Sequence, residues 1–223
     1  MAQDLFQSPD YLQLDDFLTE EHKMIRDAVR QFIEAEVRPR RDELEFGDTP
    51  PYDVIRSFYR TFGMDQMARD SFSRRIKRDK EVEAGTAAPL EGREAAGNNA
   101  GMTLIPIIEL CRCSPGLVTA MGVSTGLGAG TIMSRGTVRQ KERWALDLLT
   151  FEKVGAWAIT EPDSGSDAFG RMQSTARRDG DEYLLNGSKT FITNGPYADT
   201  TVFICKLDEG NPPSERKILS FVL

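Results

Sequence analysis

The chain has 223 residues, of which 28 are Lys or Arg and 35 are Asp or Glu, so its formal net charge is −7. Because nucleic acids and anionic membranes both bind basic surfaces, this balance argues against either as the main partner. The single histidine, His22, leaves no histidine-based triad or zinc cluster. An enzyme with this sequence must therefore use carboxylates, hydroxyls, backbone amides or a bound cofactor, and no metal site is expected.

The three cysteines and the first residues both indicate a reducing compartment. Cys111 and Cys113 are separated by one residue, not by the two that zinc and redox sites use, so these thiols and Cys205 are expected to be free. The first six residues include an acid and are not followed by the apolar run of a signal peptide. We therefore expect a cytoplasmic protein.

Residues 1–153 are expected to form an all-helical N-terminal domain. Thr19 is the expected cap of a helix whose apolar residues recur every three or four positions until Pro39. Pro50–Pro51 begin a second helix and Gly63 ends it. Further apolar helix patterns occupy residues 102–110, 113–134 and 138–149.

The segment 64–100 has the weakest pattern. A basic run is followed by acidic residues, which favours a solvated helix and then a loop over a phosphate-binding patch. The loop is expected around Gly97–Asn99. The charged residues are Arg69, Arg74, Arg75, Lys77, Arg78, Lys80, Glu81, Glu83, Glu91 and Glu94.

The segment 113–134 has 22 residues without a charge and could be mistaken for a membrane span. Gly122, Gly126 and Gly130 have the four-residue spacing that lets membrane helices approach closely. However, six of the 22 residues are Ser or Thr, a composition too polar to favour insertion. We expect a soluble helix that is buried on nearly all sides, and no membrane span.

Residues 154–223 are expected to form a β domain. The apolar run 154–160 precedes Pro162, and Gly180–Asp181 marks a hairpin turn. Short strands separated by Gly, Asn and Asp indicate an antiparallel sandwich or barrel, so the expected fold class is α+β. The further expected strands are residues 172–178, 183–187, 189–193, 201–205 and 218–223.

The densest chemical pattern is the segment Trp157–Asp167. An apolar run ends in the Thr160 hydroxyl, and the loop after it offers Ser164, Ser166 and backbone amides from Gly165 onward. Such a loop can form a nest of N–H groups for a phosphate or a carbonyl oxygen. Pro-Asp-Ser-Gly is also an ordinary turn sequence, so this pattern alone leaves both interpretations open.

A second pattern follows about 25 residues later. Asn186–Gly187 is expected to close a hairpin, and Phe191 and Thr193 are two residues apart, which places them on one face of the expected strand. An aromatic ring beside a hydroxyl suits a flat heteroaromatic cofactor. A half-buried strand with its usual aromatic and β-branched residues shows the same pattern.

Together, in this order and spacing, the two patterns resemble the acyl-CoA dehydrogenase family of flavoproteins. The resemblance is close over residues 115–206 and looser over 19–63. It is carried by the segments Trp157–Asp167, Asp179–Lys189, Phe191–Gly195, Leu127–Gly130 and Gly136–Arg143.

The resemblance implies FAD as cofactor and the α,β-dehydrogenation of an acyl-CoA thioester, by removal of the α proton and hydride transfer to flavin N5. It also implies an electron-transferring flavoprotein as acceptor, and a homo-oligomer (a dimer of dimers) or a second chain that completes the fold. In the family a C-terminal helical domain carries the catalytic glutamate. That domain is expected to be absent from these 223 residues, so this chain alone is expected to be inactive because the base is missing.

The resemblance further implies which residues bind the cofactor. Thr193 would lie near flavin N5, and Ser166 would contact the flavin diphosphate or the CoA part of the substrate. The implied cofactor-binding residues are Trp157, Ala158, Ile159, Thr160, Gly165, Ser166, Phe191, Ile192 and Thr193.

No catalytic residue is assigned. Carboxylates in turns usually accept structural hydrogen bonds, and this is the role expected for Glu161, Asp163 and Asp167. Two alternatives stay open: a non-catalytic or truncated relative that acts as a binding or assembly protein, and a flavin oxidase or monooxygenase on the same scaffold. The acyl chain length is also open.

The sequence departs from the family pattern within these residues. The glycine-rich loop that the family usually has is replaced by the charged segment 64–100. Leu146 and Phe151 stand where the family tends to have Pro and Gly. These two substitutions are expected to change how the helices lead into the β domain.

Overall fold

The computed structural model describes residues 18–88 and 100–223, and its contacts divide the chain into two compact units. The first unit comprises residues 1–54 and 89–118, and the second comprises 55–88 and 119–223. The boundary expected after residue 153 stays a prediction. The expected loop at Gly97–Asn99, with Glu91 and Glu94, lies outside the described residues.

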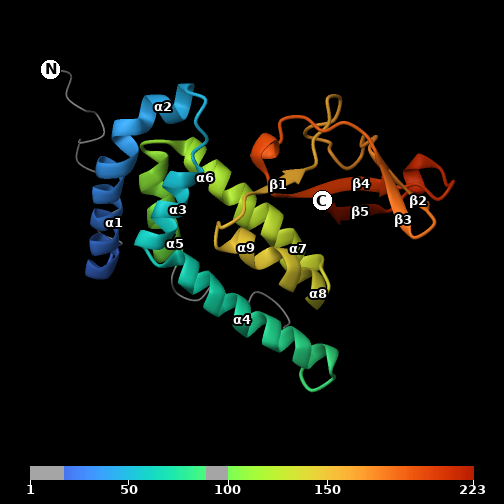
Figure 1. Ribbon diagram of the computed structural model, residues 1–223, viewed down its shortest axis with the longest axis horizontal. Coiled ribbons are helices and arrows are strands. Elements are labelled where there is room, and N and C mark those ends of the chain that lie inside the picture. The colour runs from blue at the N-terminus through green and yellow to red at the C-terminus, as the bar shows by residue number, and fades with distance from the viewer. Residues whose placement is uncertain (1–17, 89–99) are drawn as a thin grey trace. The chain divides into compact units, whose positions relative to one another are not determined.

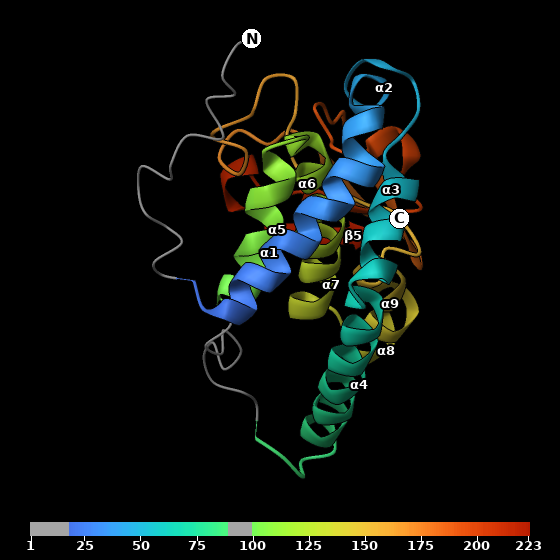
Figure 2. The same cartoon turned by 90° about the vertical axis from the view of Figure 1, so that its left-hand side faces the viewer.

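The described part of the first unit is helical. Thr19 caps the first helix as predicted, because its hydroxyl accepts a hydrogen bond from the His22 amide at 3.2 Å. The helices α1 and α5 lie side by side (Figure 2), joined by two hydrogen bonds from Arg30 to Glu109 at 2.8 and 3.0 Å. The elements are α1 (Glu20–Phe32), η3 (Ile33–Val37), η4 (Arg38–Arg40), α2 (Arg41–Phe46) and α5 (Ala100–Cys111).

The second unit contains most of the remaining helices. Gly63, with φ 63°, ends α3 as predicted, and α4 confirms the solvated helix expected for the charged segment, since Phe72 and Ile76 are its buried residues. The helices α3 and α6 cross the division between the units. The elements are α3 (Tyr52–Thr61), α4 (Met64–Glu83), α6 (Pro115–Gly122), η5 (Val123–Ala129), α7 (Gly130–Arg135), α8 (Val138–Gln140), η6 (Lys141–Ala145) and α9 (Leu146–Leu149).

The elements α6, η5 and α7 form one helix, Pro115–Arg135, which is long and apolar enough to cross a membrane by length and composition alone. Only 33% of an apolar 18-residue stretch of this helix is buried. The prediction that the helix is buried on nearly all sides is therefore wrong. One face, which includes Ser124, Gly128 and Ile132, is buried, whereas Leu127 is exposed. The absence of a membrane span stays a prediction.

The sheet of the second unit is built around β4. Its elements are β1 (Gly155–Ala158), β2 (Thr175–Asp179), β3 (Glu182–Asn186), β4 (Thr200–Leu207) and β5 (Ile218–Val222). β4 is parallel to β1 and β2 and antiparallel to β5. The predicted turn at Gly180 is confirmed, since β2 and β3 form an antiparallel hairpin around its φ of 61°.

The α+β class holds for the described residues, because helices precede the strands, but the expected antiparallel sandwich or barrel is wrong. The sheet is mixed. Parallel pairing requires a long connection that returns the chain to the starting end of the neighbouring strand. The segment between Ala158 and Thr200, which includes the β2–β3 hairpin, provides this connection for β1 and β4.

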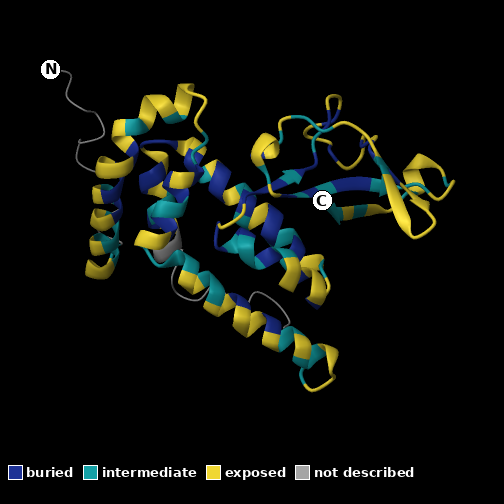
Figure 3. Cartoon of the chain, in the orientation of Figure 1, coloured by how far each residue is buried: buried dark blue, intermediate teal, exposed yellow. Residues whose placement is uncertain are grey.

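The alternation of side chains along β4 separates a buried face from a more open one. Val202 and Ile204 are buried and pack with Ile132 and Leu148 of the helices in one hydrophobic cluster. Thr201 and Phe203 point to the opposite face and are only partly buried. Figure 3 shows the contrast between the largely buried β4 and the exposed β3 (labelled in Figure 1). The open face of β4 is where the candidate site lies.

Candidate functional site

An open cavity of about 550 Å³ lies on this face of β4. Thr201 and Phe203 form part of its wall, together with Ala158 at the end of β1. Cavities of a few hundred to a thousand Å³ commonly hold a small ligand or cofactor. The remaining lining residues belong to one segment and are Lys189, Thr190, Phe191, Ile192, Gly195 and Pro196.

Within this segment, residues 189–194 form an arch, so the strand that the sequence predicts at residues 189–193 is wrong. Phe191 (φ 54°) and Asn194 (φ 65°) have left-handed backbone conformations, which a strand cannot accommodate. The expected hairpin at Asn186–Gly187 is wrong as well, since Asn186 ends β3. Gly187 packs against Ser174 so closely that a Cβ atom there would lie 2.1 Å from the Ser174 hydroxyl. Phe191 and Thr193 therefore share no strand face.

The first end of the arch is bonded to the segment that follows β1. The Thr190 amide donates to the Thr160 carbonyl at 2.9 Å, and the Thr160 hydroxyl donates to the Thr190 carbonyl. The Lys189 ammonium donates to the Ile159 carbonyl and to the Glu161 carboxylate, both at 2.9 Å. The two sequence patterns are thus held together by hydrogen bonds. The Thr160 hydroxyl already donates its proton to the Thr190 carbonyl.

The ion pair between Glu161 and Lys189 is buried, with side chains 5% and 6% exposed. Burial alone would raise the pKa of the Glu161 carboxyl. Hydrogen bonds from Ser174, Gln173 and Lys189 outweigh burial and lower this pKa to about 2. Glu161 is therefore ionised and fully engaged at neutral pH, which confirms its expected structural role.

The second end of the arch is fixed by Asn194. Its side-chain amide donates to the carbonyls of Ala120 in α6 and Gly155 in β1, both at 2.9 Å, and the residue is buried. The short 3₁₀ turn η7 (Gly195–Tyr197) follows directly. Both ends of the arch are thus bonded to the elements that frame the cavity.

The structure brings only some of the predicted site residues to the cavity. Ala158, Phe191 and Ile192 line it, and the Phe191 ring is 94% exposed. Trp157 lies on the other face of β1 and packs against the core cluster, while Ile159 is buried within that cluster. Thr193 follows the lining residue Ile192 directly, and Thr160 comes two residues after Ala158, but neither threonine lines the cavity itself.

The loop with Gly165 and Ser166 does not line the cavity, and both residues are exposed. The loop is a structured turn: the Ser164 hydroxyl donates to the Asp167 carbonyl at 2.8 Å. The Asp167 carboxylate accepts from the Gly170 amide at 3.2 Å, in agreement with the structural role expected for it. Asp163 is exposed. The predicted roles of Gly165 and Ser166 stay predictions.

Lys189, Asn194, Thr201 and Phe203 are among the residues of the site that sequence reasoning missed. Lys189 carried a signal, because a lysine between hydroxyl and apolar residues needs a partner once it is buried. Asn194 carried one as well, since Asn before Gly is typical of left-handed turns. Thr201 and Phe203 belong to a strand that was predicted, but its parallel pairing with β1 was not.

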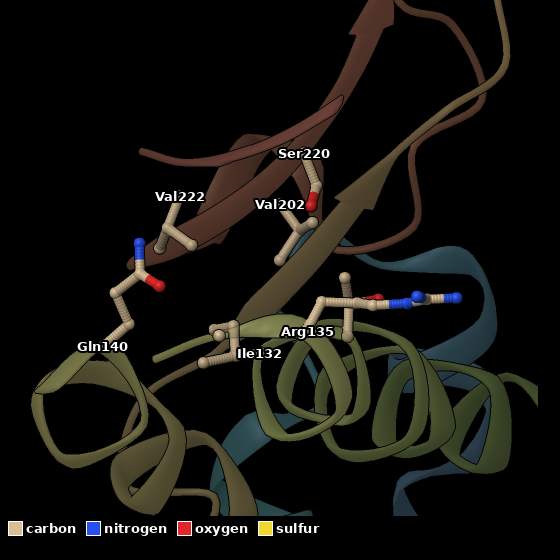
Figure 4. Close-up of a pocket in the computed structure, with 8 residues that line it drawn as sticks. Ile132, Arg135, Gln140, Val202, Ser220 and Val222 are labelled. Carbon is tan, nitrogen blue, oxygen red and sulfur yellow. The ribbon is translucent and has the colours of Figure 1, made fainter. Parts of the chain in front are cut away.

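A second cavity, of about 50 Å³, lies between α7, α8 and the buried face of β4 and β5 (Figure 4). Ile132, Val202 and Val222 line it, the Gln140 amide points toward Val222, and the Arg135 guanidinium extends away from them. This volume suits water molecules but not a cofactor. The larger cavity is therefore the candidate ligand site.

Comparison with known proteins agrees with the two sequence patterns that meet at this cavity. Residues 19–70 match the N-terminal domain of acyl-CoA dehydrogenases, and residues 156–223 match their middle domain. The chain belongs to the acyl-CoA dehydrogenase family. The family resemblance noted in the sequence is thereby confirmed.

Among the similar proteins, the 3-(aryl)acrylate reductase of Clostridium sporogenes is 34% identical over 86% of this chain and 45% of its own length. The solved structure of acyl-CoA dehydrogenase from Geobacillus kaustophilus is 34% identical, with a TM-score of 0.62 over 93% of this chain and 48% of that one. An acyl-CoA dehydrogenase from Bacillus anthracis, solved in complex with FAD, is 27% identical, with a TM-score of 0.61 over 93% and 31% of the two chains. The chain thus spans about half the length of the first two of these proteins and about a third of the length of the third.

The structure gives a physical account of one departure from the family pattern. Phe151, which stands where the family tends to have Gly, has a left-handed φ of 59°. Its ring is fully buried and lies 5.7 Å from the ring of Tyr59, and its carbonyl accepts a hydrogen bond from Arg56 at 3.1 Å. Aromatic burial here compensates for a backbone conformation that suits glycine.

Proposed function

We propose that the protein binds FAD, with the flavin ring in the cavity on β4. Three observations support this: the volume of the cavity, the lining by Ala158, Phe191 and Ile192 from both family motifs, and the FAD complex of the similar Bacillus anthracis protein. The exposed Phe191 ring carries the proposal. A bulky residue in a left-handed conformation with its ring in solvent is strained, and such strain is common at ligand sites.

The proposed reaction is the oxidation of an acyl-CoA thioester to its α,β-unsaturated product. When bound, FAD supplies the acceptor for the β hydrogen, which leaves as hydride while the α proton passes to a base. In this chain Phe191 would stack on one side of the ring, and Thr193 would donate a hydrogen bond near N5. Glu161 cannot be the base, since its carboxylate accepts bonds from Lys189, Gln173 and Ser174.

The partners follow from the same proposal. Electrons would leave to an electron-transferring flavoprotein, and the protein would act as a homo-oligomer or with a second chain, in the cytoplasm. Ser166 would contact the flavin diphosphate or the CoA, and its exposed position leaves it accessible for this contact.

A second candidate is the reverse reaction, in which an α,β-unsaturated acid or thioester is reduced. The name of the Clostridium sporogenes relative favours it, since that protein is a 3-(aryl)acrylate reductase. The same site serves both directions, because hydride transfer to and from flavin is reversible in principle. The redox partner and the substrate determine which direction is used.

The test is to reconstitute the purified protein with excess FAD, remove unbound flavin by gel filtration and record the visible spectrum. We expect retained flavin. Bleaching of this flavin by a saturated acyl-CoA under anaerobic conditions, or its regeneration from the reduced form by an unsaturated one, is expected only where the domain that carries the catalytic base is also present. Phe191→Ala should weaken FAD binding, whereas Phe169→Ala, at another exposed Phe outside the cavity, should not. A wild-type protein that retains no flavin would overturn the proposal.

A further inference from the structure

The arch is joined to neighbouring elements by hydrogen bonds at both of its ends. Between β3 and η7 the chain belongs to no strand, so it lacks the ladder of backbone hydrogen bonds that fixes β1 and β4. Within the turn, the Gly195 amide donates to the Ile192 carbonyl and the Tyr197 amide donates to the Asn194 carbonyl, both at 2.9 Å. The described hydrogen bonds from this segment to other elements start from residues 189, 190 and 194.

At the end that follows Thr193, the side-chain amide of Asn194 bonds to two different elements. Its Nδ2 donates to the carbonyls of Ala120 and Gly155 at 2.9 Å each. Gly155 begins the strand that leads into Trp157–Thr160, the first family motif. One side chain thus connects the second motif to the strand that carries the first.

The chemistry of Asn suits this position in two ways. Asn adopts left-handed conformations more readily than most residues, which fits its φ of 65°. Its NH₂ group has two N–H donors, one for each carbonyl, whereas Asp would place an acceptor against two acceptors. Because Asn194 is 8% exposed, losing these bonds would remove two hydrogen bonds from a site largely closed to water.

We propose that Asn194 is a positioning residue, which holds Thr193 and Phe191 in the place where the flavin ring is recognised. This inference rests on the proposed FAD binding. Asn194 follows Thr193 directly, and its other neighbour, Gly195, lines the cavity with Ile192. A displacement of the turn would therefore move the hydroxyl and the aromatic ring relative to β1 without altering either side chain.

Two variants test the donors separately from the backbone. Asn194→Gly keeps the left-handed conformation and removes both donors, and Asn194→Asp keeps the shape and removes the same donors. Asn186→Ala is the matched control, because Asn186 is an exposed Asn at the end of β3. For both Asn194 variants we expect the dissociation constant for FAD to rise roughly tenfold, as for the loss of one to two net hydrogen bonds. We expect no change for Asn186→Ala.

A structural role alone would also weaken binding, so two further measurements are needed. In the protein without FAD, hydrogen–deuterium exchange should rise at residues 190–195 in Asn194→Gly, while β1 and β4 keep their protection. In a background that carries both Phe191→Ala and Thr193→Ala, Asn194→Gly should raise the FAD dissociation constant less than about twofold, because its effect passes through these two residues.

The outcomes separate the two proposals. Wild-type protein that binds no FAD overturns the proposed function, and with it this inference. If wild-type protein binds FAD and Asn194→Gly binds it equally well, the positioning role alone is overturned. The same follows if Asn194→Gly weakens binding as much in the Phe191→Ala/Thr193→Ala background as in the wild-type protein. Unchanged exchange at residues 190–195 would also overturn it.

Discussion

The buried pair of Glu161 and Lys189 should make the stability of the protein depend on pH in a way that one substitution removes. Hydrogen bonds to the carboxylate lower the pKa of Glu161 from 4.5 to about 2. A group with a depressed pKa in the folded state stabilises the fold above its unfolded pKa, and this stabilisation is lost as pH falls through the folded pKa. The relevant window therefore extends from about pH 4.5 down to about pH 2.

The size of the effect follows from the two pKa values. The difference between 4.5 and about 2 corresponds to about 3 kcal/mol of unfolding free energy, of which about 2 kcal/mol is lost by pH 3. Because the Glu161 side chain is only 5% exposed, screening by solvent reduces this contribution to the unfolding free energy only slightly. Between pH 6 and pH 3, wild-type protein should thus lose about 2 kcal/mol more than Glu161→Gln does.

The assay is urea unfolding followed by circular dichroism at constant ionic strength, at several pH values between 6 and 3. Asp163→Asn is the matched control, since Asp163 is an exposed carboxylate of the same turn. It should keep the pH dependence that Glu161 causes. Parallel pH profiles for wild-type protein and Glu161→Gln would refute the reasoning, because they would mean that the carboxylate gains nothing from its hydrogen bonds on folding.

Three further predictions concern single positions. Phe151→Ala should lower the unfolding free energy by about 3–5 kcal/mol, because a buried ring is lost. Phe151→Gly should cost about 1–2 kcal/mol less than Phe151→Ala, because glycine tolerates the left-handed φ. Equal losses of unfolding free energy for the two variants in urea would contradict the argument from strain. Thr193→Ala should slow flavin reduction by acyl-CoA about ten- to a hundredfold in stopped-flow measurements, and an unchanged rate would place this hydroxyl away from N5. Thr137→Ala should cost about 0.5–2 kcal/mol in thermal or urea unfolding, since its hydroxyl accepts the Gln140 amide at the start of α8; an unchanged stability would show that this cap contributes nothing.

Helix ends and tight turns could be predicted because their causes are local. The Thr19 hydroxyl accepts a hydrogen bond from an amide only three residues away. Gly63 ends its helix through its own positive φ, and Gly180 forms the turn between two strands that are adjacent in the chain. Each of these features is encoded within about four residues. The same holds for the solvated helix α4, because its run of charged residues can be read from the sequence without knowledge of any packing partner.

The arch could not be predicted because its causes are distant in the chain. Lys-Thr-Phe-Ile-Thr has the composition of a strand, and nothing within it reveals that Lys189 bonds Ile159 or that Asn194 bonds Ala120. The parallel pairing of β1 and β4 depends likewise on a connection of about forty residues. The family resemblance located the motifs, but it did not supply the contacts that shape them.

A regular strand at residues 189–193 would not have placed Phe191 where it lies. In a strand, side chains alternate between two faces and the amides are committed to a ladder. The left-handed φ of Phe191 turns its ring toward the cavity instead. Such a backbone persists only where its ends are fixed, and Lys189 and Asn194 fix them through carbonyl groups near β1. Because these bonds belong to side chains, each can be removed while the hydrogen bonds between β1 and β4 stay intact. Substitutions at Lys189 and Asn194 should therefore alter the ligand site more than the sheet that supports it.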